Sequence, residues 1–348
     1  MANAARRRLD VAEAAELIRD RLRGWGTVHM PIDAAQGEVL RQSITAERDQ
    51  PPFDRVTMDG IAIRHSAFAA GLRTFPVAGT QSAGSAPMPL PNEKSCVAIM
   101  TGAALPPGAD TVVPVERISR EDAIAIVEAG YQPVAGQFIH RRASDHSQGA
   151  TLLSPGAVLG APELAILTVG GSDSVEVARR PAIAIISTGD ELVDVGQPLG
   201  PTQIRASNDR AIAAALATRG FLDCDRLHLP DDRAVLEREL RQLLAEQDVL
   251  ILTGGVSMGE FDFVPRVLQA LGMELVFHKV LQRPGMPLWF GMSPDGKPVF
   301  ALPGNPVSSL VCLVRYVAPA LVAALGAMTR PEPVVRLAQA VRFEPDLT

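Results

Sequence analysis

Cysteine is scarce in this chain, and its few cysteines form no recognisable motif. The 3 cysteines, Cys96, Cys224 and Cys312, are widely spaced, and their odd number supplies neither a disulfide framework nor a CxxC pair for a metal or redox site. Such sparing use of cysteine is typical of a reducing compartment, so we predict a cytoplasmic location.

Positive charge is also in short supply. The formal net charge is -6 at pH 7, and the pI is near 5.6. Proteins that bind nucleic acid concentrate basic residues on one face. The composition therefore argues against nucleic acid as a partner, and any anionic ligand must be held by a local site.

Long uninterrupted apolar segments are absent as well. The longest apolar stretch, Val307 to Leu325, is broken by Arg315 and Pro319, which favours a buried helix over a membrane span. The opening sequence MANAARRRLDVAEAAELIRD has no continuous apolar core followed by a cleavage site, so we predict no secretory signal.

Familiar phosphate and metal motifs are missing too. Neither GxxxxGK[ST] nor GxGxxG occurs, and the 6 histidines show no HExxH or paired metal spacing. We find no internal repeat. A nucleotide or metal site must therefore be built from other residues.

The length and the apolar content predict several folded domains. The chain has 348 residues, of which 47% are hydrophobic, and a single core rarely grows beyond roughly 250 residues. The first 50 residues look helical, because Asp10 and Glu13 resemble a capping box in front of an apolar stripe. From Pro51 onward, loops rich in proline, glycine and serine separate short apolar runs, which predicts a β-rich domain.

From Pro181 the pattern alternates between candidate strands and helix-length segments. This alternation predicts βαβ units, and hence a doubly wound, mostly parallel α/β sheet. We therefore expect a multi-domain α/β protein whose parts are a helical, elongated linker domain (1–53 plus 138–178), a β-rich inserted domain (54–137), the α/β domain (179–329) and the start of an incomplete C-terminal β domain (330–348).

Three loops stand out because each follows a candidate strand: STGDEL at 187 to 192, TGGVSMGEFD at 253 to 262, and LPGNPVSS at 302 to 309. Parallel strands place their carboxyl ends at one edge, where open α/β sheets bind ligands. Glycines let backbone amides approach a ligand, and the last loop leads into a helix whose N-terminus favours an anion. The candidate binding residues are Thr188, Gly189, Asp190, Gly254, Gly255, Ser257, Gly304, Asn305 and Ser308, and Ser309 could add a further donor.

Carboxylates share this edge of the sheet. Asp190, Glu191, Glu260 and Asp262 would repel a phosphate unless a cation lay between them. A hard divalent ion held by oxygen ligands, most plausibly Mg²⁺, resolves that conflict.

Each of these residues also has a simpler interpretation. Asp190 or Glu191 taken alone is more often an acid at a helix start, and Asp262 fits that role equally well. Asn305, between two prolines, could only cap the following helix. The convergence of all three loops is harder to explain in this way.

Other polar residues leave the same choice open. Lys279 and Arg283, in FHKVLQRPGMP, could supply positive charge to the edge, or could be a strand-end lysine and a turn residue. Asp145 lies in a polar loop and is typical of a turn. Asp59-Gly60, between apolar residues, is a hairpin-turn signal, and Thr101 at a Thr-Gly step favours a turn hydroxyl.

Taken together, the motifs resemble a known family, the molybdopterin molybdenumtransferases (MoeA type, shared with the C-terminal domain of gephyrin). The resemblance rests on PPFDRVTMDGIAIR, IMTGAALPPGADTVV, ISTGDEL, TGGVSMGEFDF and LPGNPVSS, in that order, and it covers roughly residues 8 to 330. Within it, Met286 stands where the family usually has lysine, and Ala143-Ser144 replaces a glycine-rich lead into Asp145.

The resemblance implies a concrete reaction. It is the Mg²⁺-dependent insertion of molybdate into adenylylated molybdopterin, with release of AMP. The implied functional acids are Asp59, Asp145, Glu191, Asp231 and Asp262, with Glu191 and Asp262 as the first choices for metal ligands. Thr101, Lys279, Arg283 and Ser308 would contact substrate or oxyanion, and Pro303 and Pro306 would shape the last loop.

The resemblance further implies an elongated homodimer, whose cleft combines the α/β domain of one chain with Asp59 and Thr101 of the other. The adenylyltransferase that acts one step earlier would be a possible partner. Two other functions fit the same sequence. One is a molybdopterin adenylyltransferase, which would leave the first 150 residues without a role. The other is a non-catalytic binding scaffold of the gephyrin kind.

Overall fold

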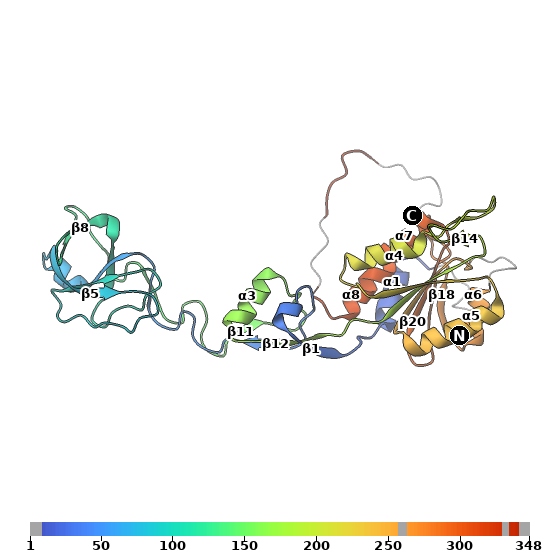
Figure 1. Ribbon diagram of the computed structural model, residues 1–348, viewed down its shortest axis with the longest axis horizontal. Helices are drawn as coiled ribbons and strands as arrows, with labels where there is room; N and C mark the ends of the chain where they lie inside the picture. Colours follow the sequence, from blue (N-terminus) through green and yellow to red (C-terminus); the bar gives the residue numbers. More distant parts are fainter. Residues whose placement is uncertain (1–8, 257–262, 329–333, 341–348) are drawn as a thin grey trace. The chain divides into compact units, whose positions relative to one another are not determined.

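The computed structural model describes residues 9–256, 263–328 and 334–340. The chain divides into two compact units, coloured along the sequence in Figure 1. The α/β unit comprises Met1–Gln42, Ser154–Ala165 and Ser172–Thr348, and the β-rich unit comprises Ser43–Leu153 and Ile166–Gly171.

The α/β unit is built on a six-stranded sheet with the order β16-β13-β17-β20-β19-β18. The first four strands in this order run parallel to one another, whereas β19 is antiparallel to both of its neighbours. The strands are β13 (Ile183–Thr188), β16 (Cys224–Leu229), β17 (Val249–Thr253), β18 (Glu274–His278), β19 (Trp289–Met292) and β20 (Pro298–Leu302).

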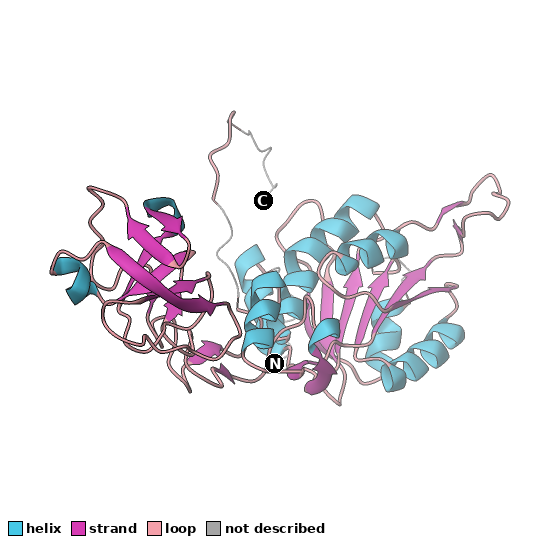
Figure 2. Ribbon diagram, turned by 60° about the vertical axis from the view of Figure 1, so that its left-hand side comes forward, coloured by secondary structure: helices cyan, strands magenta, loops and turns pink. Residues whose placement is uncertain are grey.

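Helices cover both faces of this sheet, as Figure 2 shows. Successive strand residues point to opposite faces, so Ile183 and Ile185 join one core and Ala184 and Ile186 the other. The first core is completed by α1 (Val11–Arg21), α4 (Asn208–Ala217), α7 (Pro306–Cys312) and α8 (Ala318–Ala324), and the second by α5 (Arg233–Glu246) and α6 (Val264–Ala270). Burial on both faces explains why strands such as VLILT are apolar throughout.

The helical stretch Pro306–Ala324 is long and apolar enough to cross a membrane by length and composition alone. It contains a π-helical turn, Leu313–Val317, between α7 and α8. Its side chains Leu313, Tyr316 and Leu321 are buried in the first core, together with Ile18 of α1. The prediction of a core helix for this segment agrees with that packing.

The first 50 residues differ from the helical prediction. Among residues 9–50, α1 is the only α-helix; β1 (Thr27–Pro31) pairs antiparallel with β12 (Ser174–Ala178), and a 3₁₀ turn, Ile32–Ala34, follows. The helix α1 packs with its buried Ala14 and Ile18 in the core of the α/β unit, because its apolar stripe needs an apolar partner there. The strand β19 was also missed, since the prolines and glycine around it look like a loop.

The β-rich unit carries a second six-stranded sheet, with the order β7-β4-β6-β5-β9-β8. Two apolar clusters form the core of this unit, one around Phe75 and Cys96 and the other around Val56 and Val112. Its strands are β4 (Gly60–Ile63), β5 (Thr74–Gln81), β6 (Cys96–Ile99), β7 (Thr111–Pro114), β8 (Ile118–Glu121) and β9 (Ile124–Val127).

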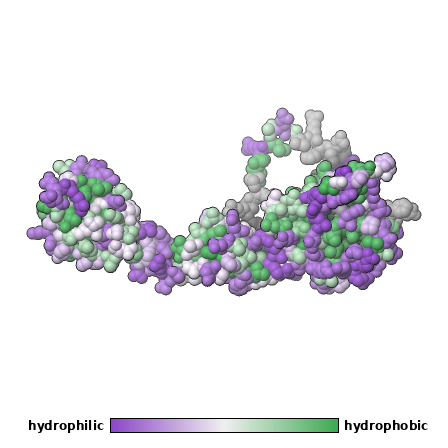
Figure 3. All heavy atoms as spheres, in the orientation of Figure 1, coloured by the Kyte–Doolittle hydropathy of each residue, from purple (hydrophilic) through white to green (hydrophobic). Residues whose placement is uncertain are grey.

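Short elements complete the chain. In the β-rich unit these are β2 (Ile44–Thr45) with β11 (Thr151–Leu153), β3 (Arg55–Val56) with β10 (Ile139–His140), the helix α2 (His65–Ala69) and the 3₁₀ turn Val115–Arg117. The helix α3 (Ala161–Val169) contributes residues to both units, and β14 (Leu192–Val193) pairs with β15 (Ile204–Arg205) in the α/β unit. Figure 3 shows hydrophilic residues over much of the visible surface of each unit, with smaller hydrophobic areas between them.

Candidate functional site

The loops that follow β13, β17 and β20 meet at one edge of the sheet. The three strands are parallel neighbours, so their carboxyl ends coincide. Gly254 donates its N–H to Leu302 O over 3.3 Å. A Cβ added to Gly254 would lie 2.5 Å from Thr188 O, and one added to Gly304 would lie 3.5 Å from the Gly254 Cα. The structure thus brings together Thr188, Gly254 and Gly304.

Asn208 joins these loops, and the sequence reasoning missed it. From the first turn of α4, its Nδ2 donates to Thr253 Oγ1 and to Gly304 O, each over 2.8 Å. Thr253 Oγ1 also lies 3.1 Å from Ser309 Oγ. The only sequence signal for this role was an asparagine at a helix start that follows a polar loop.

A buried side chain fixes the loop after β20. The buried Ser309 donates its hydroxyl to Pro303 O over 2.6 Å, so this side chain does not serve as the external donor that we predicted. Asn305 caps α7 by accepting from Ser308 N over 3.2 Å, which supports its simpler interpretation. Gly304, Asn305 and Pro306 are exposed, and Ser308 is half-buried.

The acidic loop after β13 lies beside the end of β16. Asp231 donates its N–H to Asp190 Oδ1 over 3.1 Å. His228 donates from Nε2 to Gly189 O over 2.9 Å, because a carbonyl oxygen can only accept. No helix starts at Asp190 or Glu191: the chain continues into β14, and α4 begins only at Asn208. The interpretation of these two acids as helix-start residues is therefore wrong.

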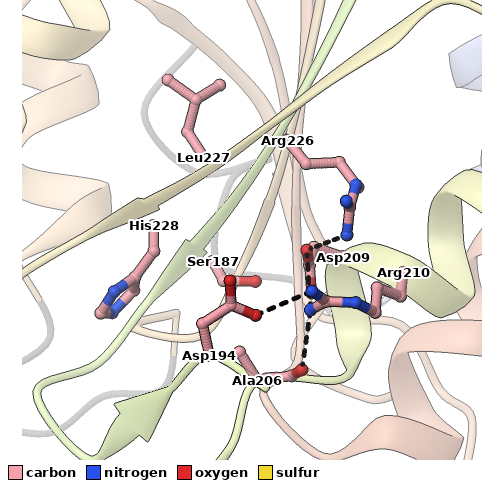
Figure 4. A pocket seen from close by; sticks show the side chains of 8 residues that line it. All are labelled: Ser187, Asp194, Ala206, Asp209, Arg210, Arg226, Leu227 and His228. Carbon is pink, nitrogen blue, oxygen red and sulfur yellow. Dashed lines mark hydrogen bonds and ion pairs between the residues drawn. The ribbon is translucent and has the colours of Figure 1, made fainter. Parts of the chain in front are cut away.

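A small polar pocket of about 130 Å³ lies behind this acidic loop. Figure 4 shows Asp209 between the guanidinium groups of Arg226 and Arg210, and Asp194 turned toward Arg210. Arg226 Nη1 donates to Asp209 Oδ2 over 3.0 Å, and Arg210 Nη2 donates to Asp194 Oδ1 over 2.7 Å. The hydrogen bond from Arg210 is the main reason that the pKa of Asp194 lies below its ordinary value.

Lys279 follows β18, whose carboxyl end lies at the same edge as that of β20, because both strands are antiparallel to β19. The preceding His278 contacts Val256 O through Nε2 over 3.3 Å, so the end of β18 adjoins the loop after β17. Burial lowers the pKa of His278. Lys279 is half-buried with a φ of 81°, so it is not a simple exposed strand-end lysine.

Arg283 lies in an exposed loop. Side chains from the π-helical turn and from α7 contact this loop. Tyr316 donates its hydroxyl to Gln282 Oε1 over 2.5 Å, and the Cys312 thiol contacts Gly285 O over 3.3 Å. Burial raises the pKa of Cys312 to about 12, so this thiol stays protonated and unreactive. The neighbouring Met286 is partly exposed.

In the β-rich unit, Asp59 and Thr101 form a pair. Asp59 Oδ1 accepts from Thr101 Oγ1 over 2.7 Å and from Thr101 N over 2.6 Å, and these bonds lower the pKa of Asp59. Asp59-Gly60 is not a hairpin turn as predicted, because β4 pairs with β6 and β7 rather than with β3. Thr101, predicted to be a turn hydroxyl, instead binds a carboxylate 42 positions earlier in the chain.

Asp145 is also in the β-rich unit, where it belongs to a chain of contacts. His140 Nε2 lies 3.0 Å from Asp145 Oδ1, and Arg55 Nη2 lies 3.1 Å from His140 Nδ1. The Asp145 N–H donates to Gln50 O over 2.9 Å. Asp145 is therefore held by two direct partners, His140 and the Gln50 carbonyl, rather than left in a free turn.

Three predicted residues, Ser257, Glu260 and Asp262, lie outside the described residues. In the part of the chain that the structure describes, no group of three or more His, Cys, Asp or Glu side chains is arranged to hold a metal ion.

Comparison with known proteins identifies the family. The model of the MoeA N-terminal region (domain I and II) matches residues 9–171, and that of a probable molybdopterin binding domain matches residues 184–323. A molybdopterin molybdenumtransferase from Synechocystis sp. is 41% identical over 309 residues, which cover 88% of this chain and 79% of the relative. One from Nostoc sp. is 35% identical over 308 residues, with 86% and 70% covered.

The chain belongs to the molybdopterin molybdenumtransferase family. A solved structure agrees: the molybdopterin biosynthesis MoeA protein from Pyrococcus horikosii superposes with a TM-score of 0.76 at 31% identity, covering 92% of this chain and 81% of that one. The family predicted from the motifs is confirmed, and so is a multi-domain, mixed α/β fold.

Proposed function

We propose that this molybdopterin molybdenumtransferase family member inserts molybdate into adenylylated molybdopterin and releases AMP. One observation carries the proposal: the loops after β13, β17 and β20 meet at one sheet edge, with Gly254 so close to Thr188 O that no Cβ fits between them. Backbone groups brought together in this way suit a phosphate-linked substrate.

The residues we assign to the reaction divide into three roles. Backbone N–H groups of the glycine loops, with Ser308 and the start of α7, hold the phosphate link. Lys279 and Arg283 offset negative charge that develops as the link breaks. The acids Asp59, Asp145, Glu191, Asp231 and Asp262 bind and orient the reacting groups, with Asp59 kept ionised by the two donors of Thr101.

Magnesium belongs to the proposal as a bound ion. Carboxylate oxygens are the ligands that Mg²⁺ prefers, and Glu191 with Asp262 are the residues we assign to it. Glu191 lies in the acidic loop beside Gly189. Among the described residues, no group of three His, Cys, Asp or Glu side chains is arranged to hold the ion.

The active form is proposed to be a cytoplasmic homodimer, as the family resemblance implies. The adenylyltransferase that makes the substrate is its proposed partner in solution. Nucleic acid is not proposed as a partner, since the net charge is -6.

The test is a direct assay of AMP. The purified chain is mixed with adenylylated molybdopterin, molybdate and Mg²⁺, and AMP is followed by chromatography. We expect AMP release that requires both molybdate and Mg²⁺, and its loss in Asp59→Asn with the fold intact by circular dichroism. Consumption of ATP and unadenylylated molybdopterin instead would support the adenylyltransferase alternative and overturn this assignment.

A further inference from the structure

A cavity in the β-rich unit lies beside Asp59 and has no assigned role. It opens at one end of the curled sheet, between the start of β4, the end of β6 and the segment that leads into β8. Its volume of about 350 Å³ falls within the range of small-molecule sites. Met100, Val115 and Ile118 line it, and so do Asp59 and Arg120.

The apolar wall of this cavity is open to solvent. Met100 is 47% exposed and Val115 is 51% exposed, whereas Ile99 behind them is buried. Gly60 has no side chain to add to the wall, and a Cβ added at this position would overlap the Val113 carbonyl. A flat apolar body would cover these side chains, and a methionine sulfur contacts aromatic rings favourably.

Two charged side chains line the cavity, Asp59 and Arg120, and each can form further hydrogen bonds. Asp59 uses Oδ1 for Thr101, and no donor among the described residues contacts its Oδ2. Arg120 makes no side-chain hydrogen bond or ion pair with any residue that the structure describes, and its side chain is exposed. A guanidinium group can stack on the face of an aromatic ring.

The hydrogen-bonding capacity of the carboxylate decides which ring fits. An ionised carboxylate can only accept, so it pairs best with two adjacent donors. A pterin presents a ring N–H beside an exocyclic amino group, which are two donors on one edge. Adenine presents an amino group beside a ring nitrogen acceptor, which would face the carboxylate unfavourably.

We propose that the cavity bounded by Asp59, Met100, Val115 and Arg120 binds the pterin ring of the substrate, with the amino edge of the ring on Asp59. This inference rests on the proposed function, because it assumes a pterin substrate. It gives the β-rich unit a role in recognising the ring.

The experiment measures binding of 6-hydroxymethylpterin, a fluorescent pterin, to the full chain. The variant Val115→Glu places a second carboxylate against the ring, and we expect it to weaken binding at least about tenfold, which is about 1.4 kcal/mol. The matched control is Val134→Glu, since Val134 is 67% exposed in the same unit and does not line the cavity. This control should bind as the unaltered chain does.

Two further measurements make the assignment specific. The corresponding lumazine, which has a carbonyl oxygen in place of the 2-amino group, should bind more weakly than the pterin, and Asp59→Asn should reduce that difference. AMP should not compete with the pterin. Equal binding of the pterin to Val115→Glu and Val134→Glu, or displacement of the pterin by AMP, would overturn the proposal.

The same variants separate this inference from the proposed function. If AMP is released but Val115→Glu leaves the KM for adenylylated molybdopterin unchanged, the ring site is wrong and the transferase assignment stands. If the pterin binds as predicted but no AMP is released, the ring site stands and the transferase assignment is wrong.

Discussion

At the scale of single residues, each unit has side chains that link loops which are distant in sequence. Asn208 contacts residues 45 and 96 positions later in the chain with one amide nitrogen. Thr101 spans 42 positions to reach Asp59. No covalent bond joins these loops, so such hydrogen bonds hold them in place. Removal of one of them should therefore change the local geometry more than it changes the fold.

Asn208→Asp removes the amide that bridges Thr253 and Gly304 without changing the size of the side chain. The carboxylate has no N–H to donate and would face the Gly304 carbonyl, so the free energy of unfolding of the α/β unit should fall by roughly 1–3 kcal/mol. The KM for substrate should rise. Denaturant unfolding and steady-state kinetics check this.

Asn92→Asp is the control for that change, because Asn92 accepts from Lys94 N through its oxygen, which an aspartate retains. We expect no comparable fall in the free energy of unfolding for Asn92→Asp. If the two variants unfold alike, Asn208 has no bridging role.

Thr101→Val keeps the shape of the side chain and removes the hydroxyl that donates to Asp59. Because this hydrogen bond is the largest cause of the lowered pKa of Asp59, the pKa should rise in the variant. The lowered pKa stabilises the fold above the unfolded-state pKa, and that contribution is lost as the pH falls through the folded-state pKa. The acidic limb of the activity profile should therefore move to higher pH.

The carboxyl carbon of Asp59, followed by NMR as a function of pH, reports the pKa directly. Thr57→Val serves as the control, since Thr57 is exposed in the same unit and makes no hydrogen bond to Asp59. An unchanged Asp59 titration in Thr101→Val would show that the backbone donor alone sets the pKa.

At the scale of elements, the close approach of the loops after β13 and β17 requires glycine. Gly254 has a φ of 96°, and an added Cβ would lie 2.5 Å from Thr188 O. Gly296 has a φ of 84°, but nothing lies within 4 Å of its added Cβ. Alanine at either position meets about 1–2 kcal/mol of backbone strain. Only Gly254→Ala should also push the two loops apart.

We therefore expect Gly254→Ala to lose more stability than Gly296→Ala and to lose most of its AMP release. Thermal unfolding and the AMP assay measure the two effects. Equal losses in both variants would mean that the loops can separate without harm to the site.

The acidic loop has its own support, the ion pair between Asp194 and Arg210 near the pocket of Figure 4. Both side chains are more than a third exposed, so the pair should contribute under about 1 kcal/mol to global stability. Its effect should be local. Arg210→Asp alone should speed amide hydrogen exchange in residues 190–205, because the two carboxylates repel each other.

Reversal of both charges, Asp194→Arg with Arg210→Asp, should restore slow exchange. The matched control reverses Glu237 and Arg241, an exposed pair on α5 that does not contact this loop. If the double reversal exchanges as fast as the single variant, the ion pair does not hold the loop.

At the scale of the whole molecule, two units have separate apolar cores. Phe75 is fully buried in the β-rich unit, and Phe290 is fully buried in the α/β unit. Phe75→Ala should therefore destabilise the first unit and Phe290→Ala the second, each by about 3–5 kcal/mol. Calorimetry should resolve two transitions, each sensitive to one variant. A single transition that both variants lower equally would contradict separate folding units.

Sequence patterns predicted the strands of the α/β unit well. Buried strands in a doubly wound sheet are apolar on both faces, so β13, β17 and β20 are conspicuous as AIAIIS, DVLILT and PVFAL. The motifs between them, together with those of the first half, were specific enough to name the family. Prediction failed for β19 and for the region after α1, where short strands lie among prolines and glycines and lack a long periodic pattern.

The sequence by itself was enough to place the buried strands β13, β17 and β20, and with them the sheet edge at which their following loops meet. Hydrophobic periodicity depends only on neighbours in the chain, so it can be read directly. Only the tertiary structure decided that Asn208 joins two of those loops, that Ser309 points inward and that Asp59 pairs with Thr101 beside an open cavity. Such contacts are made or lost by shifts of about an ångström. The positions of the groups that make them are set by the packing of many remote side chains.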